Sequence, residues 1–247
     1  MRKIDLPLKP AQLTKEVQDR LTEAFLENPD KKVWDRPYIK EALLNMTYHK
    51  CAYSEVVLQE NSSYMEVEHF YPKSLYPHKV VEWGNMLPVC KVCNNKKGKA
   101  DPKEILLINP LTDEPSRHLS FQHYLCKPLD EKGSNSIQYY DLNHSQFTKP
   151  RFTQIQSNEK QLDFLAKEME ENITESAQRR FAERFKVVLQ TGQKTEPYSV
   201  CISLAIISNK HYDSIKAYLK RIKLWDCELE ILDAGLTCKE TCKTGAK

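Results

Sequence analysis

Several features that would assign the chain to a functional class are missing from its sequence. It contains no run of the ~18 apolar residues that a membrane-spanning helix needs, so we expect no membrane partner. The first residues, MRKIDLPLKPAQ, lack the apolar stretch of a secretory signal, so we expect a cytoplasmic protein. No internal repeat is present. The formal net charge is only +3, so any surface that binds phosphate must be local.

What remains is the composition of a soluble globular protein. The chain has 247 residues, of which 40% are hydrophobic and 29% charged, which suits one large domain or two small ones. Eight cysteines in an intracellular chain indicate free thiols or metal ligands rather than disulfides.

Apolar periodicity predicts helices at both ends of the chain. Residues 15–45 carry helical spacing that is broken around Pro29, which predicts two helices, with Pro37 at an early position of the second. Helical spacing returns from 157 to 190, and CISLAII (201–207) and IKAYLKRIKLW (215–225) predict two more helices.

Between these helical parts the apolar residues do not follow a helical period. Short apolar runs, ILLI at 105–108 and SIQYY at 136–140, alternate with turn residues and predict short strands and loops. We therefore divide the chain into an N-terminal arm with helices (1–48), a central chemical segment (49–104), short strands and loops (105–156), a C-terminal helical part (157–235) and a flexible tail (236–247).

The central segment gathers the residues that can carry chemistry. MEVEH at 65–69 alternates as a strand that places Glu66 and Glu68 on one face and His69 on the other. A turn ends at Asn85, a short second strand follows at 86–88, and we expect a basic helix to begin at Asn94.

Cysteines flank this constellation. CKVC at 90–93 is half of a tetrahedral zinc site, and CAYS at 51–54 has the spacing of the other half. The second half carries Ser54 where a fourth sulfur would stand, so only Cys51, Cys90 and Cys93 remain.

These motifs resemble the HNH endonuclease family. The order Glu68-His69, Asn85, Asn94 and the closing CNNKKG match its pattern, although Glu68 stands where the family more often has Asp. The resemblance implies an α+β fold, mainly helical, with a small ββα-metal finger embedded in a helical body. A wider likeness to the HNH effectors of Septu and retron anti-phage systems, the PtuB family, spans about 48–152, through CAYSE, VEHFYPKS, INPLTDEP and YDLN.

The resemblance and the residue types together predict a metal-dependent phosphodiesterase. His69 is the expected base for water, and Glu68 and Asn94 offer oxygens to Mg²⁺ or Mn²⁺, a role that Glu66 could share. By resemblance, Asn85 ties the loop to the His69 backbone. The expected phosphate contacts come from four lysines: Lys73, Lys96, Lys97 and Lys99.

The three-cysteine site is expected to be weak or empty of structural Zn²⁺, because a serine hydroxyl is a poor ligand beside thiolates. Water or His49 would be its alternative fourth ligand.

The resemblance also implies partners: nucleic acid, a PtuA-like ATPase and, as further candidates, a retron reverse transcriptase with its msDNA. Two alternatives stay open, namely the same chemistry on a structured RNA such as tRNA, and a catalytically silent zinc-bearing adaptor. Residues 1–10 are expected to be extended and to dock on the ATPase or, more simply, on their own domain.

Overall fold

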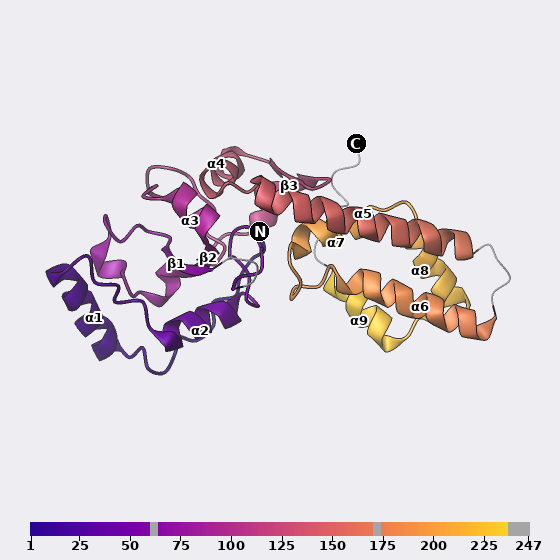
Figure 1. Cartoon of the computed structure of the whole chain (residues 1–247), viewed down its shortest axis with the longest axis horizontal. Coiled ribbons are helices and arrows are strands. Elements are labelled where there is room, and N and C mark those ends of the chain that lie inside the picture. The colour runs from indigo at the N-terminus through magenta and orange to yellow at the C-terminus, as the bar shows by residue number, and fades with distance from the viewer. Residues whose placement is uncertain (60–63, 170–173, 237–247) are drawn as a thin grey trace. The chain divides into compact units, whose positions relative to one another are not determined.

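The computed structural model describes residues 1–59, 64–169 and 174–236 (Figure 1). The chain forms two compact units, one of residues 1–120 with 126–144 and the other of 121–125 with the residues from 145 onwards. The class is α+β and mainly helical, as the sequence predicts. No helix in the described ranges is long and apolar enough to cross a membrane.

The first unit contains two small helices at its start and a strand–strand–helix arrangement in its centre. Its elements in chain order are α1 (Lys15–Glu27), α2 (Pro37–Met46), β1 (Met65–His69), the 3-10 turns η1 (Pro77–Lys79) and η2 (Trp83–Asn85), β2 (Met86–Cys90), α3 (Lys91–Lys97), η3 (Pro115–Arg117) and α4 (Glu131–Tyr140).

The two N-terminal helices confirm the prediction, including Pro37 as the first residue of α2. Thr14 caps α1 by accepting a hydrogen bond from the Val17 amide. Both helices bury one apolar face in a core that also contains Val80, Trp83 and Met86. This core joins the helices to the segment that carries the candidate site.

β1 and β2 pair as an antiparallel hairpin in which His69 lies opposite Met86 and Glu68 opposite Leu87. α3 packs on both strands (Figure 1). It begins at Lys91 rather than at the expected Asn94, because β2 passes into the helix at Cys90 without an intervening turn. Gly98, with a φ of 54°, ends α3 in a left-handed conformation that favours glycine.

The N-terminal arm packs on its own unit, which is the simpler of the two interpretations. The Ile4 amide donates to the Pro110 carbonyl at 2.8 Å, and the Trp83 indole donates to the Pro7 carbonyl at 2.9 Å. Ile4 is buried, whereas Leu8 is exposed.

The prediction of short strands between 105 and 156 is largely wrong. ILLI at 105–108 forms no strand, and SIQYY at 136–140 lies in α4, whose N-cap Asp130 accepts from the Gly133 amide. The strands that do occur are β3 (Leu119–Gln122) and β4 (Leu125–Pro128), which form a second two-stranded sheet. The segment forms a helix because its buried residues, Gly133, Ser136 and Tyr140, recur at helical spacing.

The second unit is a bundle of five helices among its described residues. They are α5 (Ser145–Glu168), α6 (Glu175–Gln190), α7 (Ser199–Ile207), α8 (Tyr212–Arg221) and α9 (Cys227–Gly235). α5 packs against α6, α7 and α8, and α9 packs against α6.

Two expectations for this part need correction. The helical segment expected at 157–190 is two helices, and the first begins earlier, at Ser145, with Pro150 inside it. Pro150 and the polar residues around it interrupt the apolar periodicity, so the sequence does not predict the first part of α5. α9 was not predicted. The flexible tail was expected at 236–247; its first residue, Leu236, is buried, and the others lie outside the described residues.

Candidate functional site

His69 ends β1 with its side chain almost entirely buried, at 4% exposure. Its Nε2 lies 2.8 Å from the Val80 carbonyl oxygen. A carbonyl oxygen can only accept, so Nε2 carries the proton and Nδ1 is the acceptor in the neutral ring. The Trp34 and His69 rings make a T-shaped contact, with the two centroids 4.9 Å apart and the planes at 81°.

Burial lowers the pKa of His69 to about 4. The positive charges of Lys73 and Lys97 add to this effect, while the hydrogen bond to Val80 opposes it. At neutral pH the ring is therefore neutral, and its Nδ1 lone pair can accept a proton.

Asn85 lies in the connection between β1 and β2, directly before β2, and holds two loop segments together. Its Oδ1 accepts from the Tyr71 amide at 2.8 Å, and its Nδ2 donates to the carbonyls of Tyr71 and Lys79 at 3.1 and 3.0 Å. Its own carbonyl accepts from the Phe70 amide at 2.9 Å. Asn85 thereby ties the residues that follow His69 to Lys79, the residue before the Val80 carbonyl that His69 contacts.

The two carboxylates of β1 share a face, as the alternation predicts, and both meet α3. Glu66 accepts a hydrogen bond from the Asn94 side-chain amide. Glu68 lies beside Lys97, with Nζ and Oε1 2.5 Å apart. Asn94 and Lys97 are three positions apart on α3, and Glu66 and Glu68 are two positions apart on β1. Each carboxylate therefore has one partner on the helix.

Glu68 and Lys97 form a buried ion pair, with side-chain exposures of 5% and 0%. Burial raises the pKa of Glu68, and the charge of Lys97 works against that rise. The Lys97 ammonium also donates to the His69 carbonyl at 3.1 Å. Lys97 therefore does not belong to an exposed phosphate-binding surface, contrary to the sequence prediction; it connects α3 to both residues at the end of β1.

The other three predicted phosphate contacts are accessible. Lys96 and Lys99 are exposed, and Lys73 is partly exposed with its ammonium 4.9 Å from the centre of the Trp34 ring. Lys73 contributes to the low pKa of His69, which places its charge within electrostatic reach of that ring.

The three predicted cysteines come together beneath the hairpin. Among the described residues, Cys51, Cys90 and Cys93 are the one group of three or more His, Cys, Asp or Glu ligands close enough to hold a metal ion. Their sulfur atoms lie within 4.8 Å of one another. The Cys51 segment is held against β2 by the Ala52 amide, which donates to the Pro88 carbonyl at 2.9 Å.

Ser54 occupies the fourth position of this cluster. Its side chain is 1% exposed and its Oγ lies 3.8 Å from the Cys90 sulfur. Burial raises the pKa of Cys51, but hydrogen bonds from Cys90, Cys93 and Ser54 outweigh it and hold that pKa well below the usual range. The hydrogen bond to Cys51 raises the pKa of Cys90 to about 12.

His49, the alternative fourth ligand, is exposed and does not belong to the cluster. The site therefore offers three soft ligands and one hydroxyl, and only one of its thiols is disposed to ionise. That donor set fits Zn²⁺ incompletely.

Oxygen donors for a hard cation come from β1 and α3. Glu66 and Glu68 supply carboxylates, and Asn94 directs its amide nitrogen to Glu66, so its amide oxygen faces elsewhere. Oxygen is the donor that Mg²⁺ and Mn²⁺ prefer, so these residues fit such an ion by their chemistry. Lys97 already balances one of the two negative charges.

Two participants were not predicted. The carbonyl of Val80 gives no signal in the sequence, because every residue has one. Trp34 lies in the connection between α1 and α2, outside the motif, and its aromatic identity alone is typical of core packing.

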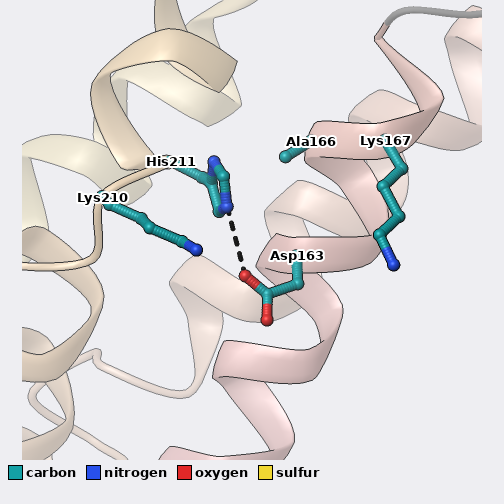
Figure 2. Close-up of a pocket in the computed structure, with 5 residues that line it drawn as sticks. All are labelled: Asp163, Ala166, Lys167, Lys210 and His211. Atoms are coloured by element: carbon teal, nitrogen blue, oxygen red, sulfur yellow. Dashed lines mark ion pairs between the residues drawn. The ribbon is translucent and has the colours of Figure 1, made fainter.

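The second unit contains a separate cavity of about 330 Å³. Figure 2 shows His211 directed at Asp163, and the ring Nε2 lies 3.2 Å from the carboxylate. Ala166, Lys167 and Lys210 complete the lining. None of the residues predicted from the sequence lines this cavity.

Two known proteins are similar to this chain, and no protein-family model matches it. A Septu protein PtuB of Bacillus thuringiensis is 36% identical over 228 residues, which is 90% of this chain and 88% of that protein. Another, from Bacillus mycoides (strain KBAB4), is 31% identical over 146 residues, covering 46% of this chain and 49% of that protein. The first match extends over almost the whole of both sequences, so the chain belongs to the PtuB family of Septu proteins.

Proposed function

We propose that the chain is a metal-dependent HNH endonuclease and the nuclease effector of a Septu anti-phage system. The observation that carries this proposal is the environment of His69. Its Nε2 is fixed by the Val80 carbonyl, its pKa is about 4, and two carboxylates on the same strand, Glu66 and Glu68, meet side chains of α3. This is the arrangement that general-base attack by water on a phosphodiester needs.

His69 acts as the base. Because Nε2 donates to Val80, Nδ1 is the atom that accepts the proton of the attacking water. The low pKa keeps Nδ1 free of a proton at neutral pH, and the 4% exposure of the side chain shields it from bulk solvent. Asn85 acts through the loop: it fixes the Lys79 carbonyl, one residue before the carbonyl that orients the ring.

Glu68, Asn94 and Glu66 are the residues that would hold Mg²⁺ or Mn²⁺. Such an ion supplies electrostatic stabilisation of the charge that develops on the phosphate and on the departing oxygen. Lys97 supports the same site from the interior, since it pairs with Glu68 and donates to the His69 carbonyl. Lys73, Lys96 and Lys99 provide the accessible positive charge for the nucleic-acid backbone.

The biological role that we propose comes from the name of the relatives. Septu proteins of the PtuB type suggest a defence role, a PtuA-like ATPase partner and a cytoplasmic location for this chain. A nuclease that acts inside its host must be held inactive, so control by a partner is physically reasonable. A retron reverse transcriptase and its msDNA are further candidate partners.

The experiment offers DNA and total RNA side by side to the purified chain, alone and with its ATPase, in Mg²⁺, Mn²⁺ or a chelator. We expect hydrolysis that the chelator abolishes. Cleavage confined to RNA would keep the chemistry and change the target. Binding of nucleic acid or the ATPase without any cleavage would overturn the enzyme proposal in favour of a zinc-bearing adaptor.

A further inference from the structure

Trp34 connects the N-terminal helices to the candidate base. It belongs to the segment between α1 and α2, far in sequence from β1, β2 and α3. Its ring contacts His69 edge-to-face at 4.9 Å and Phe25 at 6.0 Å. The ammonium of Lys73 lies 4.9 Å from the centre of the same ring.

The backbone around Trp34 is fixed by its own turns. The Trp34 carbonyl accepts from the Arg36 amide at 2.8 Å, and the Val33 amide donates to the Lys31 carbonyl at 2.9 Å. Val33 itself is buried in the core of the first unit, at 1% exposure. Trp34, by contrast, is only partly buried against that core. A rigid turn therefore presents the indole to His69.

The orientation of the His69 ring needs more than one contact. A terminal torsion that ends in a planar ring has broad energy wells, so the single hydrogen bond to Val80 restrains the ring without defining its plane. The Trp34 ring, nearly perpendicular to the His69 ring, supplies the second restraint. The two contacts together fix the direction in which Nδ1 points.

We propose that Trp34 is a positioning residue that sets the His69 ring and seats the Lys73 ammonium beside it. Trp34 contacts both side chains: His69, the base that takes the water proton, and Lys73, a cation placed to meet a phosphate. This inference rests on the proposed nuclease function for its kinetic consequence, but its structural content concerns the ring of His69 alone.

The kinetic test compares Trp34→Ala and Trp34→Phe in the full chain with its ATPase. Misplacement of a catalytic group by about 1 Å can cost ~10²-fold in rate. We expect Trp34→Ala to lower kcat by about 10- to 100-fold with a KM change of a few-fold, and Trp34→Phe to restore most of kcat because an aromatic ring remains. Tyr38→Leu is the matched control, since Tyr38 packs on the same core and, among the described residues, makes no ring contact with His69.

A second readout does not depend on activity. Ring-nitrogen NMR of His69 at fixed neutral pH reports the tautomer. We expect a single Nε2–H form in the unmodified chain and in Tyr38→Leu, and averaged or broadened ring signals in Trp34→Ala. Equal His69 spectra in Trp34→Ala and the unmodified chain would overturn the inference. If the spectra change while no protein cleaves nucleic acid, the nuclease proposal fails and the positioning by Trp34 stands.

Discussion

The ammonium of Lys97 lies 2.5 Å from a carboxylate oxygen of Glu68, and neither side chain is more than 5% exposed. This ion pair joins α3 to β1 at the residue next to His69, the candidate base. Because the same ammonium donates to the His69 carbonyl, the end of β1 is held from the helix side as well as through the sheet.

Lys97→Ala should destabilise the protein by about 3–5 kcal/mol, because it leaves Glu68 buried without its counter-charge. Denaturant unfolding measures the change. Lys96→Ala, one position along α3 and exposed, serves as the control and should stay within about 0.5 kcal/mol. Similar stabilities for the two variants would show that the buried pair does not hold the helix on the hairpin.

Ser54→Cys should raise bound zinc towards one per chain and raise stability as well. The substitution completes four thiols around a cluster whose three sulfurs already lie within 4.8 Å of one another, and four good ligands give apparent binding of ~10–16 kcal/mol in zinc-finger peptides. Elemental analysis of the unmodified chain should find substoichiometric zinc, and Ser54→Ala should not increase it. Stoichiometric zinc that survives a chelator in the unmodified chain would imply a fourth ligand that this structure does not identify.

The free energy of unfolding should fall as the pH is lowered from about 6.5 to about 4. The folded-state pKa of His69 is about 4, against ~6.5 in an unfolded chain, so the unfolded state binds the proton first. The stabilising contribution is therefore complete above pH ~6.5 and lost towards pH ~4, and amounts to roughly 3 kcal/mol. Denaturant unfolding across this pH range should be compared for the unmodified chain and His69→Gln. The difference between their free energies of unfolding isolates the contribution of His69. Parallel pH profiles for the two proteins would remove His69 as the cause.

Asn94→Ala should reduce cleavage in a way that added Mg²⁺ or Mn²⁺ partly restores, because it removes a candidate oxygen ligand whose amide nitrogen also holds Glu66. A titration of rate against metal concentration should show a higher half-saturating concentration with a recoverable maximum. His69→Ala should show no such recovery. Rescue of His69→Ala by metal alone would contradict the division of roles between base and metal ligands.

Much of the candidate site follows from local sequence. Strand alternation places Glu66 and Glu68 on one face and predicts that they act together, and their partners on α3 confirm the shared face. Cysteine spacing predicts that Cys51, Cys90 and Cys93 meet, which they do, since the cluster is formed by the hairpin and the loop held against β2.

The remainder depends on contacts between distant segments. Lys97 looks like one more exposed lysine of a basic run, and only the docking of α3 on β1 reveals that it is buried. Likewise, no local pattern brings Trp34 to His69, because tertiary packing of the N-terminal helices decides that contact. The helices between 105 and 156 also escape prediction from local sequence. α4 has few strongly apolar positions, and Pro150 interrupts the helical pattern near the start of α5.

The most direct test of the account replaces His69 with alanine and measures nucleic-acid cleavage by the complex with the ATPase. Loss of a general base typically costs about 10²- to 10⁴-fold in rate, so His69→Ala should abolish detectable cleavage while folding and partner binding persist. His78→Ala, at an exposed histidine of η1 in the loop that follows β1, should cleave like the unmodified protein. Unchanged cleavage by His69→Ala would contradict the assignment of the base and the mechanism built on it.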